Sequence, residues 1–201
     1  MDKKKRWERL LIGVNKMSSL GGSLKLASRL SVLKIPILGE AYVGKTTIAN
    51  VLSGGGYVKD YKMTVGVDIF MRYIDTPRGT LRVQLWDLAG QRRFSFLRKI
   101  FYKGSHGALF VFDITREKTF SLLDDWIRDF KYLHPKTPII IVGNKKDLEE
   151  NRQVPKELGE SLATKYDTEY IEISAKTGEN VEYAFQTLLR KIAREVAVIS
   201  L

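Results

Sequence analysis

The chain has 201 residues, a net charge of +11 and no cysteine. This length suits one well-packed domain and is too short for two ordinary ones, and a content of 44% apolar and 28% charged residues is typical of a globular protein. The lack of cysteine excludes disulfides, thiolate metal sites, thiol nucleophiles and lipid attachment to cysteine. No apolar run in the sequence approaches the roughly 20 residues that span a bilayer.

The first thirty residues form a basic extension. Residues 1–30 carry a charge of +6 and the other 171 residues carry +5. Apolar side chains recur at helical spacing within residues 7–17, and the Ser- and Gly-rich residues 18–23 predict a flexible break. The basic start resembles a secretory signal, but polar residues interrupt the apolar stretch behind it. We therefore expect a cytoplasmic protein, free or peripheral on a membrane, with an extension (1–30) and one domain (31–201).

From residue 31 onward, strands alternate with helices. Apolar runs predict strands at residues 33–38, 67–75, 80–86, 108–112, 139–142 and 170–173. Helices are predicted from about residue 45, across residues 120–130, from Pro155 and over residues 180–198. The alternation predicts an α/β sandwich whose six-stranded sheet is mostly parallel, with one antiparallel strand and helices on both faces. Pro36 cannot donate a ladder hydrogen bond, so we expect a bulge or distortion there.

A phosphate-binding loop follows the first predicted strand. Residues 39–46, GEAYVGKT, fit the pattern G-x-x-x-x-G-K-[ST], with a strand before it and a helix after it. The N–H groups of such a loop and of the helix N-terminus attract phosphate. Lys45 is expected to reach the β- and γ-phosphates and Thr46 to bind Mg²⁺, which makes this a P-loop NTPase. The predicted nucleotide contacts here are Ala41, Tyr42, Val43, Gly44, Lys45, Thr46 and Thr47.

Two later strand ends predict a guanine site. Asn144-Lys145-Lys146-Asp147 follows one strand and Ser174-Ala175-Lys176 follows the next. The Asp147 carboxylate can accept two parallel hydrogen bonds from guanine N1–H and its 2-amino group, a pair that adenine lacks. The Ala175 N–H is placed to donate to guanine O6. The predicted base-site residues are Asn144, Lys145, Asp147, Ser174, Ala175 and Lys176.

The segment after the strand ending at Trp86 predicts the hydrolytic machinery. Asp87 stands where a second Mg²⁺-directed carboxylate belongs, and Gly90, lacking a Cβ, allows its N–H to approach the γ-phosphate. Gln91 is placed to orient an attacking water. Thr64, in a polar loop before the hairpin, supplies a hydroxyl that could complete the Mg²⁺ shell. We therefore expect Gln91 and Lys45 to act in catalysis and Thr46, Thr64 and Asp87 to hold the metal.

These motifs together resemble a small GTPase of the Ras superfamily, most similar to the Rab-like branch. The motifs stand in family order: GEAYVGKT at 39–46, TVGVD at 64–68, WDLAGQ at 86–91, GNKKD at 143–147 and SAK at 174–176. The resemblance covers residues 31–195 and implies a GTP/GDP switch that slowly hydrolyses GTP in membrane traffic or membrane-associated signalling. It implies that Tyr57 packs on the guanine. Effectors, exchange factors and GTPase-activating proteins are expected at residues 57–70 and 88–103.

Three features depart from the family pattern. Ala41 stands where many members have Gly or Ser, and we expect slow but real hydrolysis. Tyr42 replaces a small residue, and its ring either covers the phosphates, meets a regulator or is exposed. Five basic residues and no acid lie within residues 92–103, either as a solvated helix face or as a contact for an acidic regulator or lipid. No arginine finger is evident in the chain, so turnover should depend on an activating protein, by up to about 10⁵-fold.

Alternative functions remain open at this point. A P-loop kinase or ATPase would not need Asp147, and a module that binds GTP without hydrolysing it would not need Gln91. The basic composition carries no base-reading motif, so we expect no nucleic-acid partner. Many Ras-superfamily members anchor through a lipidated C-terminal cysteine that this chain lacks, so residues 1–20 are the candidate contact with an anionic membrane. Packing of that segment on the domain, binding to a partner protein and disorder are its alternatives. We expect a monomer.

Overall fold

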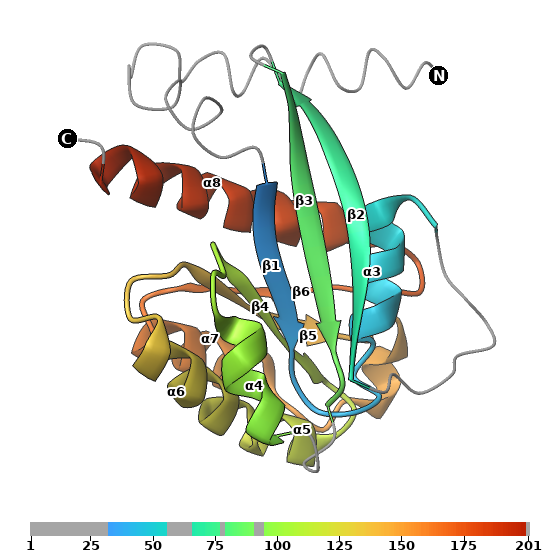
Figure 1. Cartoon of the computed structure of the whole chain (residues 1–201). Helices are drawn as coiled ribbons and strands as arrows, with labels where there is room; N and C mark the ends of the chain where they lie inside the picture. The colour runs from blue at the N-terminus through green and yellow to red at the C-terminus, as the bar shows by residue number, and fades with distance from the viewer. Residues whose placement is uncertain (1–31, 56–65, 77–78, 91–94, 200–201) are drawn as a thin grey trace.

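The computed structural model describes residues 32–55, 66–76, 79–90 and 95–199. It contains one six-stranded sheet with the strand order β2-β3-β1-β4-β5-β6 (Figure 1). The strands are β1 (Val32–Leu38), β2 (Val67–Thr76), β3 (Gly79–Leu88), β4 (Ala108–Asp113), β5 (Ile139–Asn144) and β6 (Glu169–Glu172). Only the β2–β3 pair is antiparallel. The predicted mostly parallel sheet with one antiparallel strand is therefore confirmed.

Helices cover both faces of the sheet. They are α3 (Lys45–Ser53), α4 (Ser95–Tyr102), α5 (Glu117–Ser121), α6 (Leu123–Leu133), α7 (Lys156–Lys165) and α8 (Val181–Ile199), with the 3-10 helix η2 (Lys146–Asn151). One apolar core joins the sheet to α3 and α8, and a second joins the other face to α4, α6 and α7. No helix within the described ranges is long and apolar enough to cross a membrane.

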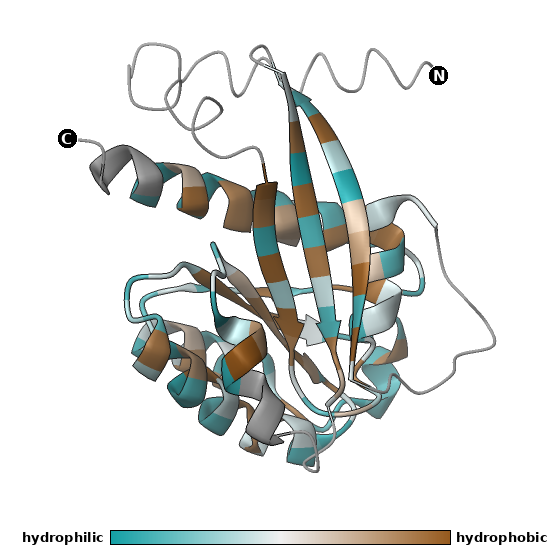
Figure 2. Ribbon diagram, in the orientation of Figure 1, coloured by the Kyte–Doolittle hydropathy of each residue, from teal (hydrophilic) through white to brown (hydrophobic). Residues whose placement is uncertain are grey.

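The central and edge strands are buried to different extents. Every residue of β4 and β5 is buried, as expected of strands covered on both faces. The edge strand β2 instead mixes polar and apolar residues, and all of them are half-buried or exposed. Figure 2 shows bands of both kinds of residue along β2 and β3. The face of the β2–β3 hairpin that points away from α3 and α8 is therefore partly open to solvent.

The bulge expected at Pro36 is wrong. β1 pairs with β3 without interruption from Val32 to Ile37. The backbone of Lys34 faces β4, because its N–H donates to His106 Nδ1 (3.0 Å) and its carbonyl accepts from the His106 N–H (2.9 Å). Alternate residues of a strand face the same neighbour, so Pro36 faces this side too. The pairing with β4 begins only at Ile37, so the missing N–H interrupts no ladder there.

The predicted helices differ from the observed ones in detail. The helix expected across residues 120–130 is two helices, α5 and α6, that meet at Leu122. Pro155 precedes α7 as its N-cap rather than as its first residue. η2, directly after β5, was not predicted. The amphipathic pattern of residues 7–17 lies outside the described residues.

Candidate functional site

The phosphate loop of residues 39–46 connects β1 to α3, and its backbone demands glycine at two positions. Gly39 has φ +140°, and a Cβ there would lie 2.0 Å from the carbonyl oxygen of Val111. Gly44 caps α3 at φ +98°, and a Cβ there would lie 2.3 Å from Asn144 Nδ2. Tyr42 also adopts a left-handed conformation (φ 64°), which is unusual for a residue with a side chain. The sequence pattern therefore corresponds to a tightly determined backbone.

Lys45 and Thr46 begin α3 and point to different partners. The Lys45 side chain is buried, and its Nζ donates to the carbonyl oxygen of Glu40 (2.8 Å), on the phosphate loop itself. The Thr46 hydroxyl donates to the carboxylate of Asp87, which is fully buried near the end of β3. Two of the three predicted metal ligands are therefore in contact, and both offer oxygen. The third, Thr64, lies outside the described residues, as do Tyr57 and Gln91.

Asn144 ties the loops of the site together. Its Nδ2 donates to the carbonyl oxygen of Val43 (2.7 Å), and its Oδ1 accepts from the N–H of Ala175 (3.0 Å). The Asn144 side chain thus joins three loops and is itself buried. The Ala175 N–H, predicted to face guanine O6, donates to Asn144 in this structure. A guanine O6 would share or replace that bond.

The carboxylate predicted to select guanine is held from one side. Asp147 Oδ1 accepts from the Ser174 hydroxyl (2.6 Å), and Lys176 Nζ lies 3.9 Å from Asp147 Oδ2. The Asp147 side chain is 14% exposed. The Asp147 carboxylate is therefore held by Ser174 and still reachable from solvent.

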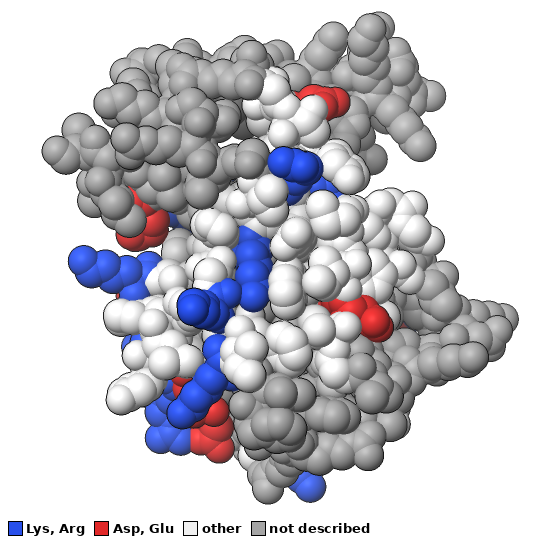
Figure 3. Space-filling view, viewed as in Figure 1, with Lys and Arg blue, Asp and Glu red and all other residues white. Residues whose placement is uncertain are grey.

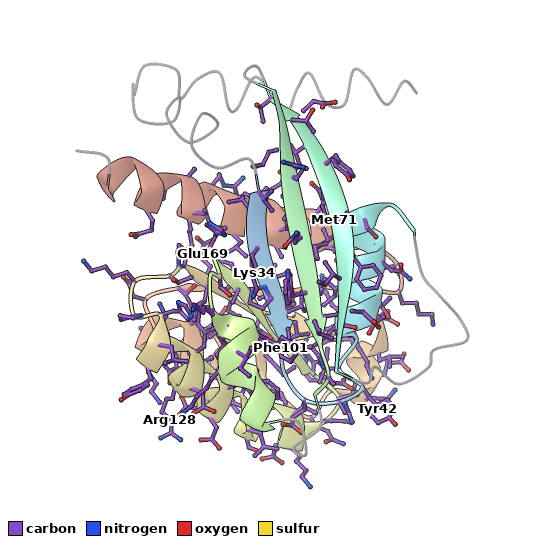
Figure 4. The ribbon with its side chains drawn as sticks, in the orientation of Figure 1. Lys34, Tyr42, Met71, Phe101, Arg128 and Glu169 are labelled. Carbon is purple, nitrogen blue, oxygen red and sulfur yellow. The ribbon has the colours of Figure 1, made fainter. Side chains whose placement is uncertain are left out.

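A cavity of about 380 Å³ opens between these loops. Its lining contains eight of the predicted nucleotide contacts, Tyr42, Gly44, Thr47, Asn144, Lys145, Asp147, Ala175 and Lys176, together with Leu148, which was not predicted. Tyr42 is 56% exposed and is labelled in Figure 4 at the end of the molecule where β1 leads into α3. Val43 and Ser174 are buried behind this lining.

A larger hollow, of about 540 Å³, lies beside η2 and α7. Three of its charged side chains are paired with one another, since Arg152 binds both Glu149 (2.6 Å) and Glu172 (2.8 Å). The hydrogen bonds that Arg152 donates to these two carboxylates raise its pKa. This hollow therefore shows an internal ion-pair network rather than a binding site.

A group that the sequence analysis missed lies behind the phosphate loop. Asp113, at the end of β4, is fully buried, and its Oδ2 accepts from Lys145 Nζ (2.6 Å) and from Arg116 Nε (2.9 Å). Arg116 Nη2 also donates to the carbonyl oxygen of Ala41 (3.0 Å). Burial alone would raise the pKa of Asp113, but hydrogen bonds from Lys145 and Thr115 more than offset it and hold that pKa below its ordinary value. The rule that ligands bind at strand ends, applied to β4, would have indicated Asp113.

Gly90 lies directly against the phosphate loop. A Cβ at this position would come within 2.3 Å of the Ala41 nitrogen and of the Glu40 carbonyl carbon. The segment after β3 therefore touches the loop backbone, and only glycine allows that approach. The predicted approach of the Gly90 N–H to a γ-phosphate stays a prediction.

The fold and this loop geometry define a P-loop nucleotide-binding protein. A model of the Ras family matches residues 34–194 of the chain. Over 163 residues the chain is 38% identical to Ras-related protein Rab-8A of Pongo abelii, covering 80% of this chain and 78% of that protein. It is 34% identical over 167 residues to Ras-related protein RABD2a of Arabidopsis thaliana (83% and 82% covered) and to Ras-related protein RIC1 of Oryza sativa subsp. japonica (83% of each).

The chain belongs to the Ras family. It is a Rab-like small GTPase, a molecular switch that binds GTP and GDP, hydrolyses GTP and regulates membrane traffic.

Proposed function

We propose that the described loops bind a guanine nucleotide with Mg²⁺ and that the residues predicted from sequence act in the following roles. The observation that carries this assignment is the cavity of about 380 Å³, whose lining combines the phosphate loop with Asp147 and Lys176. Asp147 accepts hydrogen bonds from the base, and Lys145 and Lys176 flank it. The N–H groups of the loop and of the α3 N-terminus bind phosphate. Lys45 exchanges the Glu40 carbonyl for phosphate oxygens.

The contact between Thr46 and Asp87 fits a magnesium site. Mg²⁺ takes oxygen ligands and is usually held by one or two protein groups together with substrate phosphates and water. Thr46 and Asp87 offer a hydroxyl and a carboxylate that already meet beside Lys45. Thr64 completes the ligand set when a γ-phosphate is bound. Mg²⁺ there neutralises phosphate charge during hydrolysis.

Hydrolysis is assigned to a water molecule that Gln91 orients toward the γ-phosphate. Lys45 stabilises the charge that develops on the phosphate oxygens, and the N–H of Gly90 fixes the γ-phosphate. The close approach of Gly90 to Glu40 and Ala41 supports this role. Single-turnover hydrolysis should be slowed about tenfold or more in Gln91→Leu, since orientation of the nucleophile is lost. Equal rates in the two proteins would remove Gln91 from the mechanism and favour a different source of the attacking water.

The base assignment is tested by Asp147→Asn. The asparagine side chain keeps one oxygen to accept from Ser174. It loses the negative charge and the second oxygen that would accept from guanine. We expect GDP affinity to fall by about 2–3 kcal/mol, the scale of a charge-assisted hydrogen bond. Titration of nucleotide-free protein with GDP measures this loss. Glu149→Gln is the matched control, because Glu149 is a neighbouring carboxylate that pairs with Arg152 outside the cavity. An unchanged GDP affinity in Asp147→Asn would refute the assignment.

Regulators and effectors are assigned to residues 57–70 and 88–103. The described part of these ranges adjoins one face of the β2–β3 hairpin, where strand register places Ile69 beside Trp86 and Met71 beside Gln84. Lys34 belongs to the same face, with its Nζ 3.7 Å from the centroid of the Trp86 ring. Figure 4 labels Lys34, Met71 and Phe101 on the side of the sheet turned to the viewer.

The charge of this surface indicates the chemistry of its partner. In Figure 3, Lys and Arg side chains are interspersed with uncharged ones on the face turned to the viewer. Lys99 and Lys103 are exposed, and Lys103 accepts a hydrogen bond from Lys34 Nζ at its carbonyl oxygen (2.9 Å). An apolar strip beside several cations suits a partner that carries apolar and acidic side chains. We propose that the chain itself is a monomer and that this surface contacts a different protein.

Residues 1–20 are assigned to an anionic membrane surface on the cytoplasmic side. Support comes from the sequence alone: a charge of +6 over residues 1–30 and an apolar face with Trp7. Co-sedimentation with anionic vesicles should be strong for the full chain and weak for a chain without residues 1–28. Equal binding of the two proteins would exclude this role of the extension.

A further inference from the structure

Arg116 braces the phosphate loop from outside the nucleotide cavity. It is the N-cap residue of α5, 75 positions from Ala41 in the sequence, and its Nη2 donates to the Ala41 carbonyl oxygen (3.0 Å). Its Nε donates at the same time to Asp113 Oδ2 (2.9 Å). Neither Arg116 nor Ala41 lines the cavity. The contact is therefore made outside the cavity.

The Asp113 carboxylate, to which Arg116 binds, is itself held in place. The carboxylate is fully buried and also accepts from Lys145 Nζ (2.6 Å), from the Thr115 N–H (3.0 Å) and from the Thr115 hydroxyl (2.7 Å). Arginine is a rigid planar fork, so a guanidinium held at Nε has its Nη2 direction fixed as well. The position of the Ala41 carbonyl is thus determined by a buried charge in β4.

The peptide between Ala41 and Tyr42 transmits this constraint to the cavity. All described peptide bonds are trans, and in a trans peptide the C=O and the next N–H point in opposite directions. With the Ala41 oxygen held toward Arg116, the Tyr42 N–H points away from Arg116. Tyr42 belongs to the cavity lining, whereas Arg116 does not. Tyr42 has φ 64°, a conformation that a residue with a Cβ keeps only when its surroundings enforce it.

We propose that Arg116 is a positioning residue of the nucleotide site: it holds the Ala41 carbonyl outward so that the Tyr42 N–H is directed at the β- and γ-phosphate oxygens. The inference rests on the proposed function, because it needs a nucleotide phosphate in the loop. Arg116 acts through the peptide and not on the nucleotide, since both of its described donors bind acceptors of the chain itself. Removing the brace frees the peptide to rotate and Tyr42 to leave the left-handed region.

The test compares GDP with GMP on the full chain, because GMP lacks the phosphate at which the Tyr42 N–H is directed. The variants are Arg116→Ala and Arg116→Lys, with Arg128→Ala as control; Arg128 pairs only with acids of its own helix, Asp124 and Asp125, in the part of the chain that the structure describes. Arg116→Ala should still fold, because Asp113 keeps Lys145 and Thr115 as partners. Thermal unfolding of the nucleotide-free variant checks this.

We expect GDP affinity to fall about tenfold in Arg116→Ala, the effect of losing one hydrogen bond from a charged donor, and GMP affinity to stay unchanged. Arg116→Lys should recover part of the loss, and single-turnover GTP hydrolysis should fall with GDP affinity. Equal losses for GDP and GMP would overturn the inference, because they would indicate a general loosening through Lys145. Unchanged GDP affinity would overturn it too, including the case in which hydrolysis alone falls, which would make Arg116 a direct catalytic group.

Different results would exclude the nucleotide site and the role of Arg116. If the wild-type protein binds GDP and GMP equally, the loop does not hold the β-phosphate, and the proposed function fails together with the role of Arg116. If wild type prefers GDP and Arg116→Ala keeps the same preference, the nucleotide site stands and only the role of Arg116 is lost.

Discussion

The two halves of the sheet differ in how deeply their strands are buried. β4 and β5 are buried along their whole length, whereas β2 at the opposite edge is exposed or half-buried throughout. β1 joins the halves unequally, pairing with β3 from Val32 to Ile37 but with β4 only at Ile37 and Leu38. The half containing β4, β5 and β6, which we call the closed half, carries the base loops. The hairpin of β2 and β3, the open half, offers a surface.

The two halves suit different tasks: the closed half suits binding of a ligand, and the open half suits contact with other proteins. The role that we propose for Asp147 in binding guanine needs a rigid support, and Asp147 follows a strand that is covered on both faces. A surface for other proteins needs exposed apolar groups, and Ile69 is 49% exposed on β2. The open half meets the phosphate loop at Gly90 and through the hydrogen bond from Thr46 to Asp87. A change in the phosphate loop can therefore reach the open half through these contacts.

The largest difference between the halves should appear in the closed one. Ile141 in β5 is fully buried in the core that β5 shares with α6 and α7. We expect Ile141→Ala to lower the free energy of unfolding by about 2–5 kcal/mol, because the substitution removes buried methyl groups and leaves a cavity. Denaturant unfolding of the GDP-bound protein measures the loss. A cost below about 1 kcal/mol would mean that β5 is less tightly packed than its burial indicates.

The closed half was also the easier one to predict from sequence. Its strands are continuous apolar runs such as residues 139–142, and its loops contain short motifs with a direct chemical meaning. The phosphate loop needs glycine at Gly39 and Gly44 because backbone atoms and the Asn144 side chain come within 2.3 Å of where a Cβ would be. Such constraints leave a local pattern in the sequence, so pattern and structure agree there.

The missed features depend on contacts between distant residues. Arg116 reaches Ala41 across 75 positions, and no local spacing shows that bond. Pro36 is tolerated because β4 begins too late to need its N–H, which depends on the register of another strand. The single helix expected across residues 120–130 has a continuous apolar periodicity, and the interruption at Leu122 has no breaker residue to indicate it.

The contact between the open half and the phosphate loop is tested by Gly90→Ala. The added Cβ would lie 2.3 Å from loop backbone, which cannot move aside as a side chain can. We expect a loss of about 1–3 kcal/mol in unfolding free energy, typical of overpacking, together with slower GTP hydrolysis. Gly55→Ala is the control, since its nearest neighbour is the Asn50 side chain at 3.0 Å. Equal stability of Gly90→Ala and wild type would show that Gly90 is not tightly packed against the phosphate loop.

The junction at β1 should be sensitive to acid. Burial lowers the pKa of His106 below its ordinary value of 6.5, and its Nδ1 accepts the Lys34 N–H. The unfolded chain therefore takes up the proton first, so stability is full above about pH 6.5 and falls as the pH drops from there toward the lower folded-state pKa.

The corresponding variant is His106→Gln. We expect it to flatten the fall in stability between about pH 6.5 and 5 and to cost about 1 kcal/mol at pH 8, the scale of one hydrogen bond. Urea midpoints across that pH range measure both effects. The other histidine, His134, also has a pKa lowered by burial, so His134→Gln is measured in parallel to separate the two. A slope that persists in His106→Gln and disappears in His134→Gln would assign the acid sensitivity to α6 instead of the junction.

The smallest effect is expected on the open face. Ile69→Ala removes the same atoms as Ile141→Ala, but from a side chain that is half exposed beside Trp86. The unfolding free energy should change by no more than about 0.5 kcal/mol, and GDP affinity should stay the same because Ile69 does not line the nucleotide cavity. A loss near that of Ile141→Ala would mean that Ile69 is packed in solution and that the open face is covered, with the basic extension of this chain as the first segment to examine. Wild-type stability would instead leave an apolar residue exposed without a folding role, as a contact surface for another protein requires.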